Sequence, residues 1–167
     1  MCWKSLVALF VFALILGVAV AQQPAAQQAR PDKTFSSSAD VAALIVKAES
    51  ERKGNEVVRG NILSLAPYTA NLEHRSAVAD ASVHERDVEL FYVIDGSATM
   101  VTGGKLVNEK RTNGPNLSGT AIEGGISRTI GKGDFIIVPE NTPHWFSTVN
   151  HLEVMSLHMP RSVPSAP

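Results

Sequence analysis

The sequence is poor in cysteine, with a single one, Cys2, among its 167 residues. One thiol excludes an internal disulfide framework and a metal site built from several cysteines. Charge is also scarce and balanced, with 15 basic and 16 acidic side chains and a formal net charge of −1. This balance excludes the strongly basic surface of a nucleic-acid-binding domain, so no nucleic acid is expected as a partner. The sequence also lacks a serine-nucleophile elbow and a phosphate-binding loop, which excludes the protein classes built on them.

Residues 1–21 have the layout of a secretory signal peptide. Lys4 precedes an apolar run over residues 6–21, which ends at Ala19 and Ala21 with one residue between them. An uncleaved membrane anchor is the alternative, but the run is shorter than the roughly 20 residues that a spanning helix needs. The sequence therefore predicts cleavage after Ala21 and an exported protein, periplasmic or secreted. After cleavage we expect no cysteine and no membrane association.

Residues 22–38 and 39–54 differ sharply in composition. The first segment is rich in Gln, Pro and Ser, which predicts a flexible linker. The second carries one apolar stripe at helical spacing and ends in basic residues followed by Gly54. The stripe consists of Val41, Leu44, Ile45 and Ala48. We therefore expect one N-terminal helix that packs as an arm on the outside of the following domain, with binding of a partner protein as the alternative.

Residues 55–160 are typical of an all-β domain. Short β-rich runs alternate with turns that contain Gly or Pro, and no second helical pattern follows. Closely spaced short strands predict a sandwich or a barrel. Residues 108–125 are polar and turn-rich, and we expect them to form a long loop that acts as a lid. Residues 161–167 are predicted to form a flexible tail.

Two segments of this domain carry the side chains of a candidate metal site. In the first, a short turn separates His84 from Glu89, which lies at the start of an apolar run; in the second, His144 begins another predicted strand. A hairpin after His84 would place Glu89 beside it. If His144 converges on the same point inside a barrel, two imidazoles and one carboxylate form a metal-binding face that leaves open positions for substrate, water or O₂.

The spacing of these residues resembles the two sequence motifs of the cupin superfamily. The residues that match the motifs are His84, Glu89, Gly96, Gly133, Pro139 and His144. The resemblance covers residues 63–158 and implies a double-stranded β-helix of the jelly-roll type, which closes into a β-barrel. It also implies that His84, Glu89 and His144 hold a divalent metal ion inside the barrel, with Fe, Mn, Ni, Zn and Cu as the candidates.

The sequence departs from the cupin motifs at three positions. Ser82 stands where the family has the first His of a His-x-His pair, Asn141 replaces the Gly of Pro-x-Gly, and Thr148 replaces a final Asn. Asn141 still tolerates a positive φ. The loss of the first His removes one of the usual four ligands. The site would then bind metal more weakly, be completed by water or another side chain, or be a relic.

Six side chains are candidates for the substrate pocket: His74, Arg75, Ser82, Phe91, Phe146 and His158. Strand alternation places the two Phe residues on the metal-facing side as apolar walls, and Ser82 on the face of His84. Only one of His74 and Arg75 would face inward: Arg75 would bind an anionic substrate, whereas His74 would supply the missing ligand. A solvent-exposed strand face is the arrangement expected for both. His158 would face inward from the last strand.

Two kinds of function fit these patterns. The first is a metal-dependent enzyme acting on a small oxygenated metabolite, as a dioxygenase, isomerase, decarboxylase or lyase. The second is a non-catalytic module that binds a small ligand or metal, and the absence of a histidine at position 82 favours it. A purely structural interaction domain is a third reading. A small-molecule ligand is the partner expected for the first two, and the family resemblance and exposed sheet edges make a homodimer an expectation as well.

Overall fold

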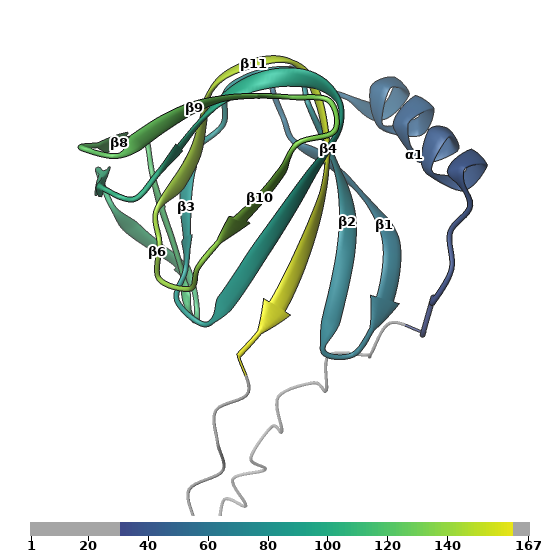
Figure 1. The fold of residues 1–167 in the computed structure, drawn as a ribbon, viewed down its shortest axis with the longest axis horizontal. Helices are drawn as coiled ribbons and strands as arrows, with labels where there is room; N and C mark the ends of the chain where they lie inside the picture. Colours follow the sequence, from purple (N-terminus) through teal and green to yellow (C-terminus); the bar gives the residue numbers. More distant parts are fainter. Residues whose placement is uncertain (1–30, 162–167) are drawn as a thin grey trace, which may run out of the picture.

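The computed structural model describes residues 31–161, in which β-strands curl into a barrel and one helix lies on the outside (Figure 1). The strands are β1 (Val58–Leu65), β2 (Tyr68–Arg75), β3 (Ala81–His84), β4 (Asp87–Thr102), β5 (Lys105–Val107), β6 (Lys110–Asn113), β7 (Asn116–Gly119), β8 (Ala121–Glu123), β9 (Ile126–Gly131), β10 (Phe135–Val138) and β11 (His144–Pro160). The predicted all-β jelly-roll fold with one N-terminal helix is confirmed. Within residues 31–161, no helix is long and apolar enough to cross a membrane.

The helix α1 (Ser38–Glu51) begins with a capping box. The Ser37 hydroxyl accepts a hydrogen bond from the Asp40 N–H, and the Asp40 carboxylate accepts one from the Ser37 N–H. The apolar stripe of the helix packs on the outer surface of β1 and β2 (Figure 1). The helix ends at Glu51 rather than at residue 54, because Arg52 already has an extended backbone (φ −60°, ψ 127°).

The segment before the helix is fastened to the barrel. The N–H and C=O of Lys33 form backbone hydrogen bonds of 2.7 and 2.9 Å with Ser64 of β1. Residues 31–37, which the sequence predicts to be part of a flexible linker, are therefore tied to a strand. The predicted signal peptide, the rest of the linker and the tail beyond residue 161 lie outside the described residues.

The two longest strands, β4 and β11, form the spine of the barrel. They pair antiparallel along almost their full length, from His144 opposite Thr102 to Pro160 opposite Asp87. One edge of β11 also pairs with β2 and β3, while β4 pairs with β9 and β10. Three register shifts along β11 interrupt the β4–β11 ladder and let it curl, so that β11 arches over the barrel (Figure 1).

Gly96 of β4 is required where the ladder bends. Its φ is +78°, and a Cβ atom at this position would overlap the carbonyl oxygen of His151 on β11. Only glycine satisfies both the left-handed backbone and the close approach of the neighbouring strand. The close packing of β4 against β11 thus explains why the motif has a glycine at position 96.

The long loop predicted over residues 108–125 is wrong. This segment contains β6, β7 and β8, and β7 pairs with β3 so that Asn116 lies opposite His84. The sequence does not indicate a strand at β6, because β6 is exposed along its whole length and shows no alternation of apolar and polar side chains. Strands β6 and β7 extend the main sheet next to β3, whereas β8 pairs with β5 in a separate two-stranded sheet, so the expectation that the segment forms a lid is wrong as well.

Two apolar cores hold the fold together. The first fills the barrel and contains Phe91, Val93, Ala98, Met100, Ile130, Val138, Phe146, Leu152 and Val154. The second lies between the barrel wall and α1 and contains Ala48, Ile62, Ala70 and Leu72. Strand β2 is consequently covered on both faces, by the barrel interior and by the helix.

Candidate metal centre

Three strand ends bring the predicted metal ligands together. His84 is the last residue of β3, Glu89 lies near the start of β4, and His144 is the first residue of β11. The turn before β11 is held by Asn141, whose φ is +56° and whose N–H donates to the His84 carbonyl oxygen at 2.7 Å. Asn141 therefore adopts the positive φ expected of it, and its backbone ties the turn to the strand that carries His84.

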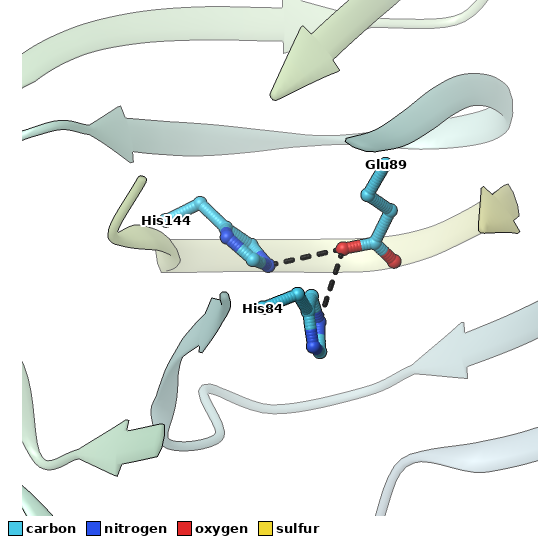
Figure 2. Close-up of side chains that lie close together, drawn as sticks. All are labelled: His84, Glu89 and His144. Atoms are coloured by element: carbon cyan, nitrogen blue, oxygen red, sulfur yellow. Dashed lines mark ion pairs between the residues drawn. The ribbon is translucent and has the colours of Figure 1, made fainter. Parts of the chain in front are cut away.

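The donor atoms of the three side chains lie at the spacing of ligands that share one ion (Figure 2). The Glu89 Oε2 atom is 3.1 Å from Nε2 of His144 and 3.4 Å from Nε2 of His84. Metal–ligand bonds of about 2.0–2.2 Å separate neighbouring donors by about 2.8–3.6 Å at octahedral or tetrahedral angles. Both distances from Oε2 to the imidazole Nε2 atoms lie in this range.

Outer hydrogen bonds orient both histidines with Nε2 toward the carboxylate. The Nδ1 atom of His84 is 2.8 Å from Oδ1 of Asn116, and the amide of Asn116 is itself fixed because its Nδ2 donates to Asn113. The Nδ1 atom of His144 is 3.2 Å from the carbonyl oxygen of Thr142. Both partners are acceptors, so Nδ1 donates in each ring and Nε2 is turned toward Glu89.

The carboxylate of Glu89 is nearly completely buried, and its Oε2 atom lies against the Nε2 atoms of His84 and His144. Two nitrogen lone pairs and a carboxylate oxygen that face one another repel unless protons or a cation lie between them. Burial alone raises the pKa of Glu89, but the surrounding histidines outweigh burial and hold its pKa well below the ordinary value. The group is therefore an anion, and the donor set fits a divalent cation.

Contacts with the carboxylate also affect the histidines. Burial lowers the pKa of His84, but its hydrogen bonds to Glu89 and Asn116 outweigh burial and raise it. For His158 the hydrogen bond to Glu89 is the largest influence and raises the pKa against the effect of burial. The site is thus organised around one buried negative charge.

A sequence comparison places this chain in a known family. Residues 56–158 match the family model of the cupins. The protein is a cupin. Its fold is similar to that of BH2720 from Bacillus halodurans, with a TM-score of 0.50 and 14% identity over 81% of this chain and 87% of the other. At this level of identity the likeness shows the fold alone.

Two further solved structures resemble the cupin. KdgF from Halomonas sp. has a TM-score of 0.47 and 18% identity over 66% of this chain and 85% of the other. Pac13 from Streptomyces, described as a nucleoside dehydratase, has a TM-score of 0.46 and 14% identity over 65% of this chain and 73% of the other. No curated protein matches the sequence.

The aromatic residues and Ser82 occupy the places that strand alternation predicts. The rings of Phe91 and Phe146 are both buried and meet edge to face with 5.3 Å between centroids, and Phe91 lies 5.9 Å from the His144 ring. They form an apolar wall directly beside the donors. Ser82 is paired with His144 across the sheet and lies on the same face as His84, so no imidazole occupies the position of the first motif histidine.

The predicted solvent-exposed face for His74 and Arg75 is wrong. Arg75 lies inside the barrel wall, where its guanidinium donates to Glu73 at 2.9 and 2.6 Å and stacks 4.7 Å over the Phe146 ring. His74 is buried on the opposite face, where its Nδ1 is 2.5 Å from Oε1 of Glu153. His74 therefore does not supply the missing ligand. Both side chains are covered because β2 is buried from both sides.

His158 faces the site, as predicted. Its Nε2 atom is 3.1 Å from Oε1 of Glu89, and its ring lies 4.9 Å from that of His84 in an edge-on arrangement.

Asn116, by contrast, is a site residue that the sequence analysis did not predict. The Gly-Pro turn at residues 114–115, between the paired residues Asn113 and Asn116, is the signal that would have indicated a hairpin there.

Proposed function

We propose that this cupin is an exported, metal-dependent enzyme acting on a small oxygenated metabolite, with a divalent ion held by His84, Glu89 and His144. The observation that carries the proposal is the set of two imidazole Nε2 atoms and a buried carboxylate oxygen at ligand spacing. A buried carboxylate costs stability unless protonated histidines or a cation compensate its charge, and a divalent cation would do so at this donor spacing.

When bound, a divalent metal supplies Lewis-acid activation of a bidentate oxygen ligand such as a diketone, hydroxy acid or catechol. The chain provides the surroundings for that chemistry. Phe91 and Phe146 exclude water from one side, while the side chains of His84 and His158 are 20% and 26% exposed. A substrate would therefore enter past these two histidines. Three protein donors leave positions for its oxygen atoms, which suits dioxygenase, isomerase, decarboxylase or lyase activity.

The second candidate function is a module that binds a small ligand or metal without turnover. Ser82 favours this alternative, because its hydroxyl is a poorer metal ligand than the histidine that it replaces. Metal binding is compatible with both candidates, so metal binding alone does not separate them. Turnover does.

The deciding experiment uses protein purified without a histidine tag, stripped with a chelator and reloaded separately with Fe²⁺, Mn²⁺, Ni²⁺, Zn²⁺ and Cu²⁺. Each form is assayed with oxo-acids, hydroxy acids, diketones and catechols, with and without O₂. The proposal expects turnover that Glu89→Gln abolishes. His151→Ala is the matched control, because His151 lies on β11 but is exposed and outside the site. Binding of these compounds without turnover in any metal form would favour the module instead.

Export rests on the sequence of residues 1–21. We expect protein from the native host to begin at Gln22, and mass spectrometry of its N-terminus is the measurement. An intact Met1 on cytoplasmic protein would contradict export. Homodimer formation stays a prediction.

A further inference from the structure

We propose that His158 is a fourth metal donor, standing in for the motif histidine that Ser82 replaces. The inference rests on the proposed metal site and adds a ligand to it from a different strand position. In the motif, the first two histidines are neighbours on one strand. Here the additional imidazole would come from the far end of β11.

The curl of the β4–β11 ladder makes this placement possible. His144 begins β11 opposite Thr102, whereas His158 lies near its other end, opposite Glu89. The two histidines are therefore at opposite ends of one ladder, yet both approach the same carboxylate. Both reach this carboxylate because β11 arches over the barrel, so that its two ends come down on the same side of the barrel (Figure 1).

His158 approaches the second oxygen of the carboxylate that His84 and His144 contact. Its Nε2 atom is 3.1 Å from Oε1 of Glu89, which equals the distance from His144 to Oε2. Its Nδ1 atom faces the Oδ2 atom of Asp87 at 3.6 Å. Each of the three rings thus turns Nε2 inward and Nδ1 toward an outer acceptor, the arrangement by which proteins orient metal-binding histidines.

The other histidines do not compete for this role. The chain has five, of which His74 is engaged with Glu153 on the opposite face of β2 and His151 is exposed. His158 is therefore the one imidazole available to complete the set of His84 and His144. With it, three imidazoles surround the two oxygens of a single carboxylate.

The test counts the imidazoles bound to the metal. Pulsed electron paramagnetic resonance of the tag-free protein loaded with Cu²⁺ resolves coordinated imidazole nitrogens. We expect three in the wild type and two in His158→Ala. Chelator competition with Zn²⁺ should show an affinity loss in His158→Ala that exceeds the roughly 10–100-fold caused by losing an outer hydrogen-bond partner. His151→Ala should match the wild type in both measurements.

A rescue variant distinguishes a ligand from a mere neighbour of Glu89. Adding Ser82→His to His158→Ala should return the count to three, because residue 82 lies on the face of His84. The melting midpoint of each metal-free variant checks folding, and His158→Gln replaces His158→Ala if the latter does not fold.

An equal imidazole count in the wild type and in the His158 variant would overturn the inference, while metal binding by the wild type would leave the proposed function standing. Absence of metal binding by the wild type would overturn both.

Discussion

Metal-free protein should become more stable to heat when a divalent ion is added. The folded chain holds the donors at 3.1 and 3.4 Å with both Nδ1 atoms fixed, whereas the unfolded chain has no such convergence. Binding to the folded state alone adds RT ln(1 + [L]/Kd) to the free energy of unfolding, about 2.7 kcal/mol at a free metal concentration of 100 Kd. At roughly 2–4 °C per kcal/mol for a chain of this size, the midpoint should rise by about 5–11 °C.

Differential scanning calorimetry of chelator-stripped protein, with and without Mn²⁺, Ni²⁺ or Zn²⁺, measures this shift. His144→Ala should abolish the rise, His151→Ala should keep it, and Ser82→His should enlarge it by restoring the motif ligand. A flat response in both the wild type and Ser82→His would refute the reasoning, because the donors would then not converge. A flat response in the wild type alone would mean that the site has decayed and that the enzyme proposal is wrong.

Three further predictions concern the surroundings of the site. Asn116→Ala should lower metal affinity about 10–100-fold in chelator competition, because His84 loses the acceptor that orients it; an unchanged Kd would contradict that role. Leu72→Ala should lower the free energy of unfolding in urea by about 2–5 kcal/mol and leave metal affinity unchanged, since Leu72 is fully buried under α1; a loss below about 1 kcal/mol would contradict this placement. Burial raises the pKa of Glu73, but its arginine partners outweigh burial and lower the pKa below 4.5. The ionised carboxylate therefore stabilises the fold above that pH, and this stabilisation is lost as the pH falls through the folded-state pKa. The stability difference between wild type and Glu73→Gln should therefore shrink on acidification below pH 4.5, and a pH-independent difference would count against the ion pairs.

The fold and the three principal site residues could be predicted because they depend on local spacing. The short turn after β3 returns the chain to Glu89, and the Pro-bounded turn before β11 positions His144. Alternation within a strand then determined which side chains face inward, and it holds for Ser82, Phe91 and His158.

The surroundings of β2 could not be predicted because its cover comes from distant parts of the chain. The partner of His74 is Glu153, which is 79 positions away, and α1 covers the same face. Charged residues on both faces of a strand predict an exposed strand unless the partners that bury them are known. The role of Asn116 could not be predicted for a related reason. Its partner His84 lies 32 positions earlier, and β6 and β7 are rich in polar side chains.

The most direct test of the account is the metal content of the mature protein. Elemental analysis of tag-free protein, alongside Glu89→Gln prepared identically, gives the ratio of metal to chain. Glu89→Gln keeps the shape of the side chain but removes the buried charge that opposes the cation. We predict one divalent ion per chain in the wild type and a clear loss in Glu89→Gln. A wild type without metal after reloading, or equal occupancy in the two proteins, would contradict the claim that His84, Glu89 and His144 form a metal centre.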